Sequence, residues 1–297
     1  MNYKKIFKSQ RLRFNILKIF SWIPAKIMLK IQYYVKLNRR LNLSNPKRFT
    51  EKIQHYKLFY RNKDMLLCVD KYLVRFFLKE RKVDEYLNKL YLVCNDAEEI
   101  DFSILPEKFV IKTSDGTGGE NVFICRDKST LDIKSVVSKI NSWRNRKINI
   151  MTHEWAYEGA CDSKIIIEYC LEDSSSTDNS INDYKFFCFD GEVDCLCIDM
   201  DRYSNHKRNF YDLNWNHLII DSDKLSSDVK LNKPSNFDEM IDLAKRLSKG
   251  FPFVRVDLYN VDGKIYFGEM TFYPWSGYVS FSPDIFDFKL GEKFIIK

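Results

Sequence analysis

A lysine followed closely by glycines is the group of residues in this sequence best suited to phosphate chemistry. After the apolar run Phe109–Ile111 come, in order, Lys112, Gly116, Thr117, Gly118 and Gly119. Backbone N–H groups of a glycine-rich turn can approach a polyphosphate because no Cβ blocks them, and a nearby ammonium supplies countercharge. The lysine precedes the glycines and no Gly-Lys-Ser/Thr occurs, so this is not a Walker A loop. A phosphate-binding hairpin and an ordinary turn between strands both fit the segment.

Two carboxylates near the C-terminal end could hold a divalent cation. Asp257 and Glu269 flank Asp262-Gly263, a dipeptide typical of a tight hairpin, so both side chains are expected near each other on one face. Ionised carboxylates repel unless a cation lies between them, and such hard oxygen ligands suit Mg²⁺. The alternative is two solvated strand carboxylates. The apolar residues within 253–258 weaken it, because they predict an interior strand where an unpaired acid is costly.

Arg255 precedes Asp257 by two positions, so alternation along a strand places both on the same face. Its planar guanidinium could bind an acyl phosphate or a substrate carboxylate through two parallel hydrogen bonds. It could also pair with Asp257, and the two roles are compatible.

Two further segments carry polar residues beside apolar strands. The run Ile165–Ile167 leads into Glu168, Tyr169, Cys170, Leu171 and Glu172. Such a segment could hold an adenine by main-chain bonds and a ribose by a carboxylate, or it is only a strand end. In the second segment, Asp183 and Lys185 open a buried strand and form either a structural ion pair or a phosphate contact.

The elements expected around these residues are mostly antiparallel strands with helices between them. Strands are predicted at 91–94, 109–113, 121–125, 165–169, 184–189, 193–199, 254–259 and 264–270, and helices within 44–62, 70–81, 129–146 and 237–248. Asp190-Gly191 and Asp262-Gly263 predict two hairpins, and residues 174–182 a polar surface loop. This is an α+β layout, without the strand–helix alternation of a doubly wound sheet.

Positive charge is concentrated at the N-terminus. The chain of 297 residues has a net charge of +7, yet residues 1–40 contain eleven Lys and Arg and no acid, so the remainder sums to −4. The charge is therefore not a nucleic-acid-binding property of the whole protein. Residues 1–40 are predicted to be basic helix divided at Pro24. They either contact an anionic membrane or polymer, or pack on the body as a lid with a solvated basic face.

Composition favours a reduced, cytoplasmic protein with a substantial core, since hydrophobic residues make up 45% of the chain. The eight cysteines include no metal-type Cys-x-x-Cys, and Cys195 and Cys197 are expected to be small buried residues of a strand. Lysines interrupt the apolar stretches 14–20 and 27–35, so we expect neither a signal peptide nor a membrane span.

The order of these parts resembles that of ATP-grasp enzymes and, more narrowly, of the TupA-like ATP-grasp family of bacterial surface-polysaccharide loci. The similar segments are NPKRFTEKIQHYKLFYR, VDKYLVRFF, FVIKTSDGTGG, DYKFFCFDGE and FVRVDLYNVDGKIYFGEMTFYPWSG, which together span about residues 42–280. The resemblance implies an ATP-grasp fold, in which two α+β lobes with antiparallel sheets sandwich the nucleotide. The boundaries expected are 1–43 for the basic N-terminal helical segment, 44–105 for a helical substrate subdomain, 106–172 for the small lobe and 173–297 for the large lobe.

The resemblance also implies ATP and Mg²⁺ as cofactors and a role for each candidate residue. The implied nucleotide-binding residues are Lys112, Gly116, Thr117, Gly118, Gly119, Glu168, Tyr169, Cys170, Leu171, Glu172, Asp183 and Lys185. Of these, Glu168–Leu171 would form the adenine hinge. Asp257, Glu269 and Thr271 would hold Mg²⁺, although Thr271 stands where ATP-grasp enzymes usually have Asn. Arg255 and Lys185 would be the catalytic cations.

The implied activity is ATP-dependent joining of a carboxylate to an amine through an acyl phosphate. The implied partners are a uronic acid of a surface polysaccharide, or its precursor, and an amino acid or peptide amine, with no nucleic acid. The enzyme would be cytoplasmic and, through residues 1–40, peripheral at the inner membrane face. The alternatives are a glycosyltransferase using Asp199-Met200-Asp201 as a metal-binding loop, a non-catalytic nucleotide-binding protein, and a phosphotransferase.

Overall fold

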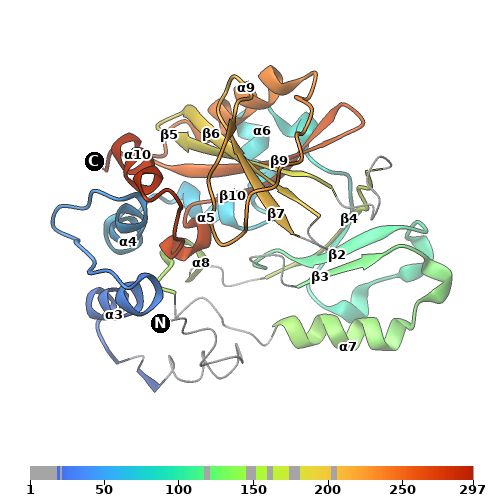
Figure 1. Ribbon diagram of the computed structural model, residues 1–297. Coiled ribbons are helices and arrows are strands. Elements are labelled where there is room, and N and C mark those ends of the chain that lie inside the picture. The colour runs from blue at the N-terminus through green and yellow to red at the C-terminus, as the bar shows by residue number, and fades with distance from the viewer. Residues whose placement is uncertain are drawn as a thin grey trace.

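Two antiparallel sheets with helices around them make up the described part of the chain (Figure 1). The computed structural model describes residues 19–20, 22–116, 121–144, 152–158, 163–173, 181–201 and 206–296. The smaller sheet has the strand order β1-β4-β2-β3 and the larger sheet the order β10-β9-β5-β6-β7-β8. All the named strand pairs are antiparallel, as the α+β prediction requires.

The smaller sheet has one face covered by a helix. Its strands are β1 Leu90–Cys94, β2 Phe109–Thr113, β3 Val122–Cys125 and β4 Ile165–Tyr169. Phe109 and Ile111 of β2 and Ile165 and Ile167 of β4 are fully buried and belong to one core cluster with residues of helix α7 (Ile133–Arg144). Strand β1, which was predicted at 91–94, lies within the expected substrate subdomain 44–105, yet it pairs with β4 of the expected small lobe. The domain boundaries stay a prediction.

The larger sheet is built on two tight hairpins. Its strands are β5 Asp183–Phe189, β6 Glu192–Met200, β7 Lys207–Tyr211, β8 His217–Leu218, β9 Val254–Val261 and β10 Lys264–Thr271. The turns at Asp190-Gly191 and Asp262-Gly263 have positive φ at both residues (51° and 87°, 51° and 76°), as a type I′ turn requires. Both hairpins are therefore confirmed.

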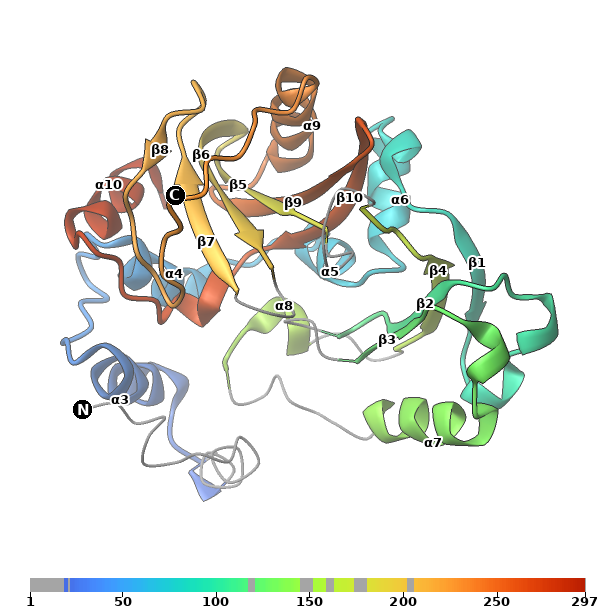
Figure 2. The ribbon, with the colours of Figure 1, turned by 45° about the vertical axis from the view of Figure 1, so that its right-hand side comes forward.

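Helices cover both faces of the larger sheet (Figures 1 and 2). Further helices include α4 Phe49–Phe59, α5 Asp64–Val69, α6 Val74–Glu80, α8 Trp155–Glu158, α9 Phe237–Ser248, the 3-10 turn η6 Pro274–Gly277 and α10 Ile285–Lys293. On one face, Phe237 of α9 packs on Phe186 of β5. On the other, Phe49 of α4 packs edge-on against Phe253, with ring centroids 4.9 Å apart.

The helix predicted within residues 70–81 is present as α6 but begins later than expected. Helix α5 ends at Val69, and α6 begins only at Val74. Between them, one carboxylate oxygen of Asp70 accepts the N–H groups of Tyr72 and Leu73, both at 2.8 Å. An acidic side chain that bonds the following backbone favours a turn over continued helix.

Helix α3 (Ala25–Leu37) begins directly after Pro24, as predicted. Its buried residues include Leu29 and Tyr33, and the Tyr33 hydroxyl hydrogen-bonds Thr50 of α4 at 2.8 Å. The first helical piece predicted within residues 1–40 falls mostly outside the described residues. None of the described helices combines the length and the apolar character needed to cross a membrane.

Candidate active site

The candidate residues of the larger sheet share the face opposite α9, which we call the site face. Phe186 points to α9, so its neighbours Asp183 and Lys185 point the other way. Strand pairing places Asp257 and Glu269 on this same face, because Lys185 lies opposite Asp257 and Asp257 lies opposite Glu269. The site face also includes Asp199, Arg208, Arg255 and Thr271.

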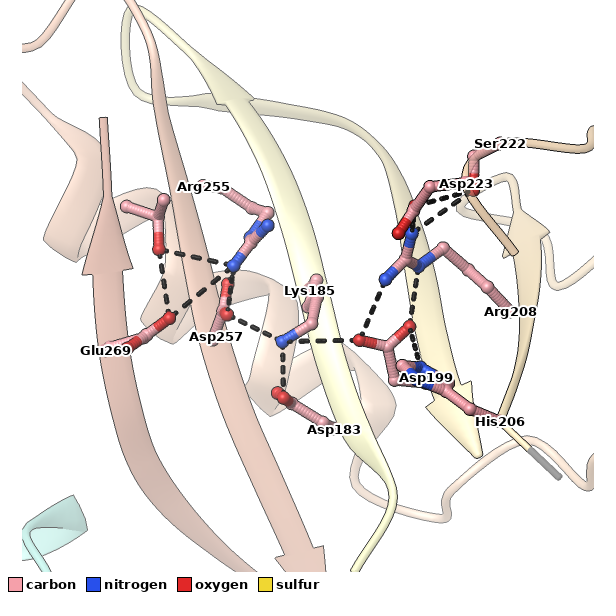
Figure 3. A network of polar contacts seen from close by, with 11 residues as sticks. Asp183, Lys185, Asp199, His206, Arg208, Ser222, Asp223, Arg255, Asp257 and Glu269 are labelled. Carbon is pink, nitrogen blue, oxygen red and sulfur yellow. Dashed lines mark hydrogen bonds and ion pairs between the residues drawn. The ribbon is translucent and has the colours of Figure 1, made fainter. Parts of the chain in front are cut away.

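Charges of alternating sign cross the site face from β10 to β7 (Figure 3). Arg255 donates to Asp257 through Nε at 2.7 Å and through Nη2 at 2.6 Å. Lys185 Nζ donates to the same carboxylate at 2.8 Å and to Asp183, and lies 3.8 Å from Asp199. Asp183, Asp257 and Lys185 are at most 5% exposed. Since a buried charge is costly unless paired, each of these groups depends on its neighbours.

Burial is the first influence on the pKa values of the two acids predicted to hold the metal. It raises the pKa of Asp257, while Arg255 and Lys185 act in the opposite direction. Burial acts in the same way on Glu269, but Lys71, Lys185 and Arg255 outweigh it, and the pKa of Glu269 is lowered. Glu269 is therefore ionised at neutral pH, as a ligand of a cation must be.

Glu269 is the more open of the two acids, with 39% of its side chain exposed. A bulge shifts the register between Phe267 and Glu269 and brings Glu269 directly opposite Asp257. Gly268 sits at this bulge, where a Cβ would lie 2.9 Å from the carbonyl oxygen of Asp257. Thr271 Oγ1 donates to Glu269 and accepts from Arg255, both at 3.2 Å. The structure thus brings together all three predicted metal ligands and Arg255.

The smaller sheet contributes a second, more open cluster. Lys112 lies on the sheet face away from α7, because its neighbour Ile111 belongs to the core that packs on that helix. Its ammonium donates to Glu168 at 2.8 Å, and Arg75 lies 3.3 Å from the other oxygen of the same carboxylate. Glu168 is 7% exposed, whereas 26% of the Lys112 side chain is exposed. Lys112 is thus paired but accessible.

Lys71 lies between the two clusters, and the sequence reasoning gave it no role. Its Nζ donates to the carbonyl oxygen of Gly116, at the start of the glycine-rich segment, and its N–H donates to Ser114 at 2.9 Å. Burial lowers the pKa of Lys71; the charge of Lys112 acts in the same direction, and the charge of Glu269 opposes it. Lys71 therefore stands near Lys112 of one sheet and Glu269 of the other. Its only signal in the sequence was its place within VDKYLVRFF.

The predicted phosphate loop lies partly outside the described residues. Gly116 is described and buried, and its N–H donates to Thr113 at 3.3 Å. Thr117, Gly118 and Gly119 are not among the described residues. Their contact with phosphate stays a prediction.

The predicted adenine hinge follows β4, and several of its groups already have partners. The N–H of Tyr169 donates to Lys89 at 2.9 Å, and its carbonyl oxygen accepts from the Asn88 amide at 2.8 Å. Cys170 is buried, and Glu172 pairs with Lys108 at 2.6 Å. Leu171 is half-buried. Their role toward adenine and ribose stays a prediction.

Asp199 and Asp201 do not form the metal-binding loop that a glycosyltransferase would need. Asp199 lies within β6, is 2% exposed and accepts a hydrogen bond from Arg208 Nε at 2.6 Å. Arg208 also pairs with Asp223. Asp201 follows the strand and is exposed. Asp199 is therefore engaged in a buried ion pair with Arg208.

Lys57 of α4 holds the η6 turn at Ser276, a contact that we call the clamp and that was not predicted from the sequence. Trp275 and Ser276 have φ of 51° and 55°, a left-handed conformation that is uncommon for residues other than glycine. Lys57, 1% exposed, donates to the carbonyl oxygen of Ser276 at 2.9 Å and to its hydroxyl at 2.7 Å. The Trp275 ring lies 5.8 Å from the guanidinium of Arg255. The clamp therefore positions an aromatic ring beside the charged row.

Solved structures similar to this chain include two D-alanine–D-alanine ligases and one synthetase. The ligase from Bacillus anthracis has 19% identity and a TM-score of 0.42, over 69% of this chain and 57% of that chain. N5-carboxyaminoimidazole synthetase from Staphylococcus aureus, complexed with ADP, has 12% identity and a TM-score of 0.42, over 69% of this chain and 44% of that chain. The Helicobacter pylori ligase has 12% identity and a TM-score of 0.39, over 76% and 58%. These TM-scores are low, and the matched region covers only 44–58% of those proteins.

No curated protein matches the chain. The family model of the TupA-like ATP-grasp proteins, in contrast, matches residues 51–295. This range runs from α4 through α10 and contains both sheets, the alternating charges of the site face, and the lysines at positions 71 and 112. The chain therefore belongs to the TupA-like ATP-grasp family and has its α+β ATP-grasp fold.

Proposed function

We propose that the protein is an ATP-dependent carboxylate–amine ligase that works through an acyl phosphate. One observation carries this proposal. Lys71 adjoins the glycine-rich segment at Gly116, and its charge interacts with both Lys112 of the smaller sheet and Glu269 of the larger sheet. Lys112 of one sheet and Glu269 of the other therefore both lie near Lys71, an arrangement suited to binding a triphosphate with its metal ion.

The oxygen donors fit Mg²⁺ in their chemistry. Glu269 is ionised and partly open, Asp257 lies directly opposite it, and the Thr271 hydroxyl contacts Glu269. These three residues would hold the ion together with phosphate oxygens. When bound, Mg²⁺ would neutralise charge on the phosphates. We propose that Lys112 and Lys71 contact the phosphates, with Gly116, Thr117, Gly118 and Gly119 covering them.

The reaction needs charge neutralisation more than a protein nucleophile. A carboxylate oxygen of the substrate attacks the γ-phosphorus, the bond to the β-phosphate oxygen breaks, and ADP leaves. The amine then attacks the carbonyl carbon, the bond to the phosphate oxygen breaks, and the amine loses a proton. Arg255, fixed by Asp257 and the Trp275 ring, is suited to hold the developing oxyanion.

Lys185 was expected to contact the phosphates, but in the geometry observed it is bound to acids of its own sheet. It touches Asp183 and Asp257, and together they form a framework that holds Asp257 in place. Contact with phosphate would require Lys185 to exchange one of these acids for the nucleotide. The Glu168–Leu171 segment would hold adenine, and Glu172 or Asp183 would lie near the ribose.

The substrates proposed follow from the family resemblance. The carboxylate would come from a uronic acid of a bacterial surface polysaccharide or its precursor, and the amine from an amino acid or peptide. The enzyme would be cytoplasmic, and residues 1–40, with eleven basic residues and no acid, would hold it at an anionic membrane face.

The test is ADP release over a matrix of uronic acids and amino acids, followed by mass spectrometry of the products. The proposal expects amide formation with stoichiometric ADP in at least one pair, and loss of both in Lys112→Ala and Glu269→Gln. A phosphorylated product without amide would instead indicate a phosphotransferase. Thermal stabilisation by UDP-sugars but not by MgATP would overturn the proposal in favour of a glycosyltransferase.

A further inference from the structure

Helix α3 is apolar on its outer side as well as on its buried side. Leu29, Tyr33 and their neighbours face the body. The outward residues are Ile27, Ile31, Tyr34 and Val35, which are 45–56% exposed. Their spacing at i, i+4, i+7 and i+8 forms one continuous stripe. A surface helix that faces only water normally carries polar residues there, so the stripe indicates a contact surface.

A basic hollow lies beside this stripe. It has a volume of about 320 Å³ and lies between α3, the segment that follows it and α4. Its lining includes Lys26, Lys30, Arg40, Asn42, Ser44 and Phe59. No acid is among the described residues that line it, and none of its three cations has an ion-pair partner in the described part of the chain. The hollow therefore presents uncompensated positive charge next to apolar side chains.

The position of α3 suits a flat partner. It lies at the periphery of the molecule, away from the two sheets, in both views (Figures 1 and 2). A second copy of this chain would set like charges against each other, because Lys26 and Lys30 flank the stripe. An anionic bilayer complements both features, since apolar side chains enter the headgroup boundary and lysines meet phosphates.

We propose that the outer stripe of α3 and the adjacent hollow form a docking site for anionic phospholipid. Ile27, Ile31 and Tyr34 insert at the boundary of headgroups and acyl chains. Lys26, Lys30 and Arg40 bind headgroup phosphates in and around the hollow. This proposal rests on the membrane contact proposed above for residues 1–40 and specifies its residues. It does not depend on the ligase chemistry.

The test is flotation of the full chain with vesicles of mixed phosphatidylcholine and phosphatidylglycerol, against vesicles of phosphatidylcholine alone. The full chain is expected to float with the mixed vesicles only. The double variants Ile27→Ser/Ile31→Ser and Lys26→Gln/Lys30→Gln should each weaken this binding about tenfold or more. A matched control is Ile133→Ser/Lys134→Gln on α7, where the isoleucine is similarly exposed (48%). It should bind like the unchanged chain.

Three outcomes would overturn the proposal. Vesicle binding that survives in both α3 double variants would place the contact elsewhere in the chain. Equal binding to neutral vesicles would remove the role of the hollow. A dimer that Ile27→Ser/Ile31→Ser converts to monomer without lipid would assign the stripe to a second copy. Thermal stabilisation by MgATP, measured on the same samples, tests the folded state and the nucleotide site separately from lipid binding.

Discussion

Each sheet holds a lysine against carboxylates, but the two lysines are enclosed to very different degrees. Lys112 of the smaller sheet is 26% exposed in its side chain and meets one acid, Glu168, which it shares with Arg75. The side chain of Lys185 in the larger sheet is only 6% exposed and faces three acids from its own and two adjoining strands. The first lysine can exchange its partner for a ligand at low cost, whereas the second is part of the framework.

This difference in exposure distinguishes ion pairs that can bind a ligand from ion pairs that stabilise the fold. A half-open ion pair contributes little to stability, and solvent access allows a phosphate to replace the carboxylate. A sealed row of charges depends on every member, because removing one leaves another buried and unpaired. Glu269 forms the open end of the row and Asp257 its closed centre. We therefore expect variants in the row to lose stability, and variants at its open end or in the smaller sheet to lose mainly affinity.

The largest effect is expected for Asp257→Asn. This change removes the charge that pairs with both Arg255 and Lys185, so two buried cations each lose one of their charged partners. The free energy of unfolding should fall by about 3–5 kcal/mol, and MgATP-dependent ADP release should disappear. Urea denaturation measures the first effect. The control is Asp238→Asn, since that side chain is 92% exposed on α9. Equal midpoints for the two variants would contradict a framework role for Asp257.

Lys112→Met should separate binding from stability. Loss of a charged contact to phosphate is expected to weaken MgATP affinity roughly tenfold or more. The free energy of unfolding should change by about 1 kcal/mol or less, because the pair is partly exposed. Titration calorimetry and urea denaturation on the same preparation test both parts. Lys245→Met, which breaks the exposed pair between α9 and Glu192, should leave MgATP affinity unchanged. A large stability loss in Lys112→Met would erase the contrast between the sheets.

Lys71→Met tests whether the two clusters face one nucleotide. Burial already lowers the pKa of Lys71, so removing this cation should cost little stability. MgATP affinity should nevertheless fall severalfold, because the charge beside Gly116 is lost. Nucleotide titration measures this effect. Unchanged affinity would argue that Lys71 only ties the glycine-rich segment to α5.

The smallest effect is a pH dependence that arises from the clamp. Burial lowers the pKa of Lys57 from 10.5 to about 8. Between these values the unfolded chain binds more protons than the folded chain, so Lys57 makes the folded state more stable as pH rises through this window. Lys57→Met should flatten that rise. Urea midpoints of both proteins at several pH values measure it, and parallel curves would contradict the prediction.

Much of the fold could be predicted, because several local signals were strong. The bounds of β2, β4 and α9 agree with the prediction at both ends. Turn residues located both hairpins, since Asp-Gly accepts the positive φ that a type I′ turn imposes. The α-helices and strands missed were α5, β7, β8, α8 and α10, most of them too short to show several repeats of the helical or strand period.

The candidate site was predicted in its parts but not in its pairing. Alternation along β9 gave Arg255 and Asp257 the same face, and the hairpin brought Glu269 opposite. The bulge at Gly268 sets this register, and an isolated glycine was its only signal in the sequence. Lys57 and Lys71 escaped notice because each lies on a helix or turn whose partner is far along the chain.

Local chemistry was therefore settled by the sequence: which segments extend, where they turn, and which strands alternate charge with apolar residues. Tertiary structure alone decided which cation meets an acid far along the chain, because such pairs join residues as distant as Lys185 and Asp257, or Lys57 and Glu154. Their energies depend on distance and burial rather than on sequence spacing. The same holds for the outer stripe of α3, whose apolar residues became a surface only once the opposite side of the helix was packed.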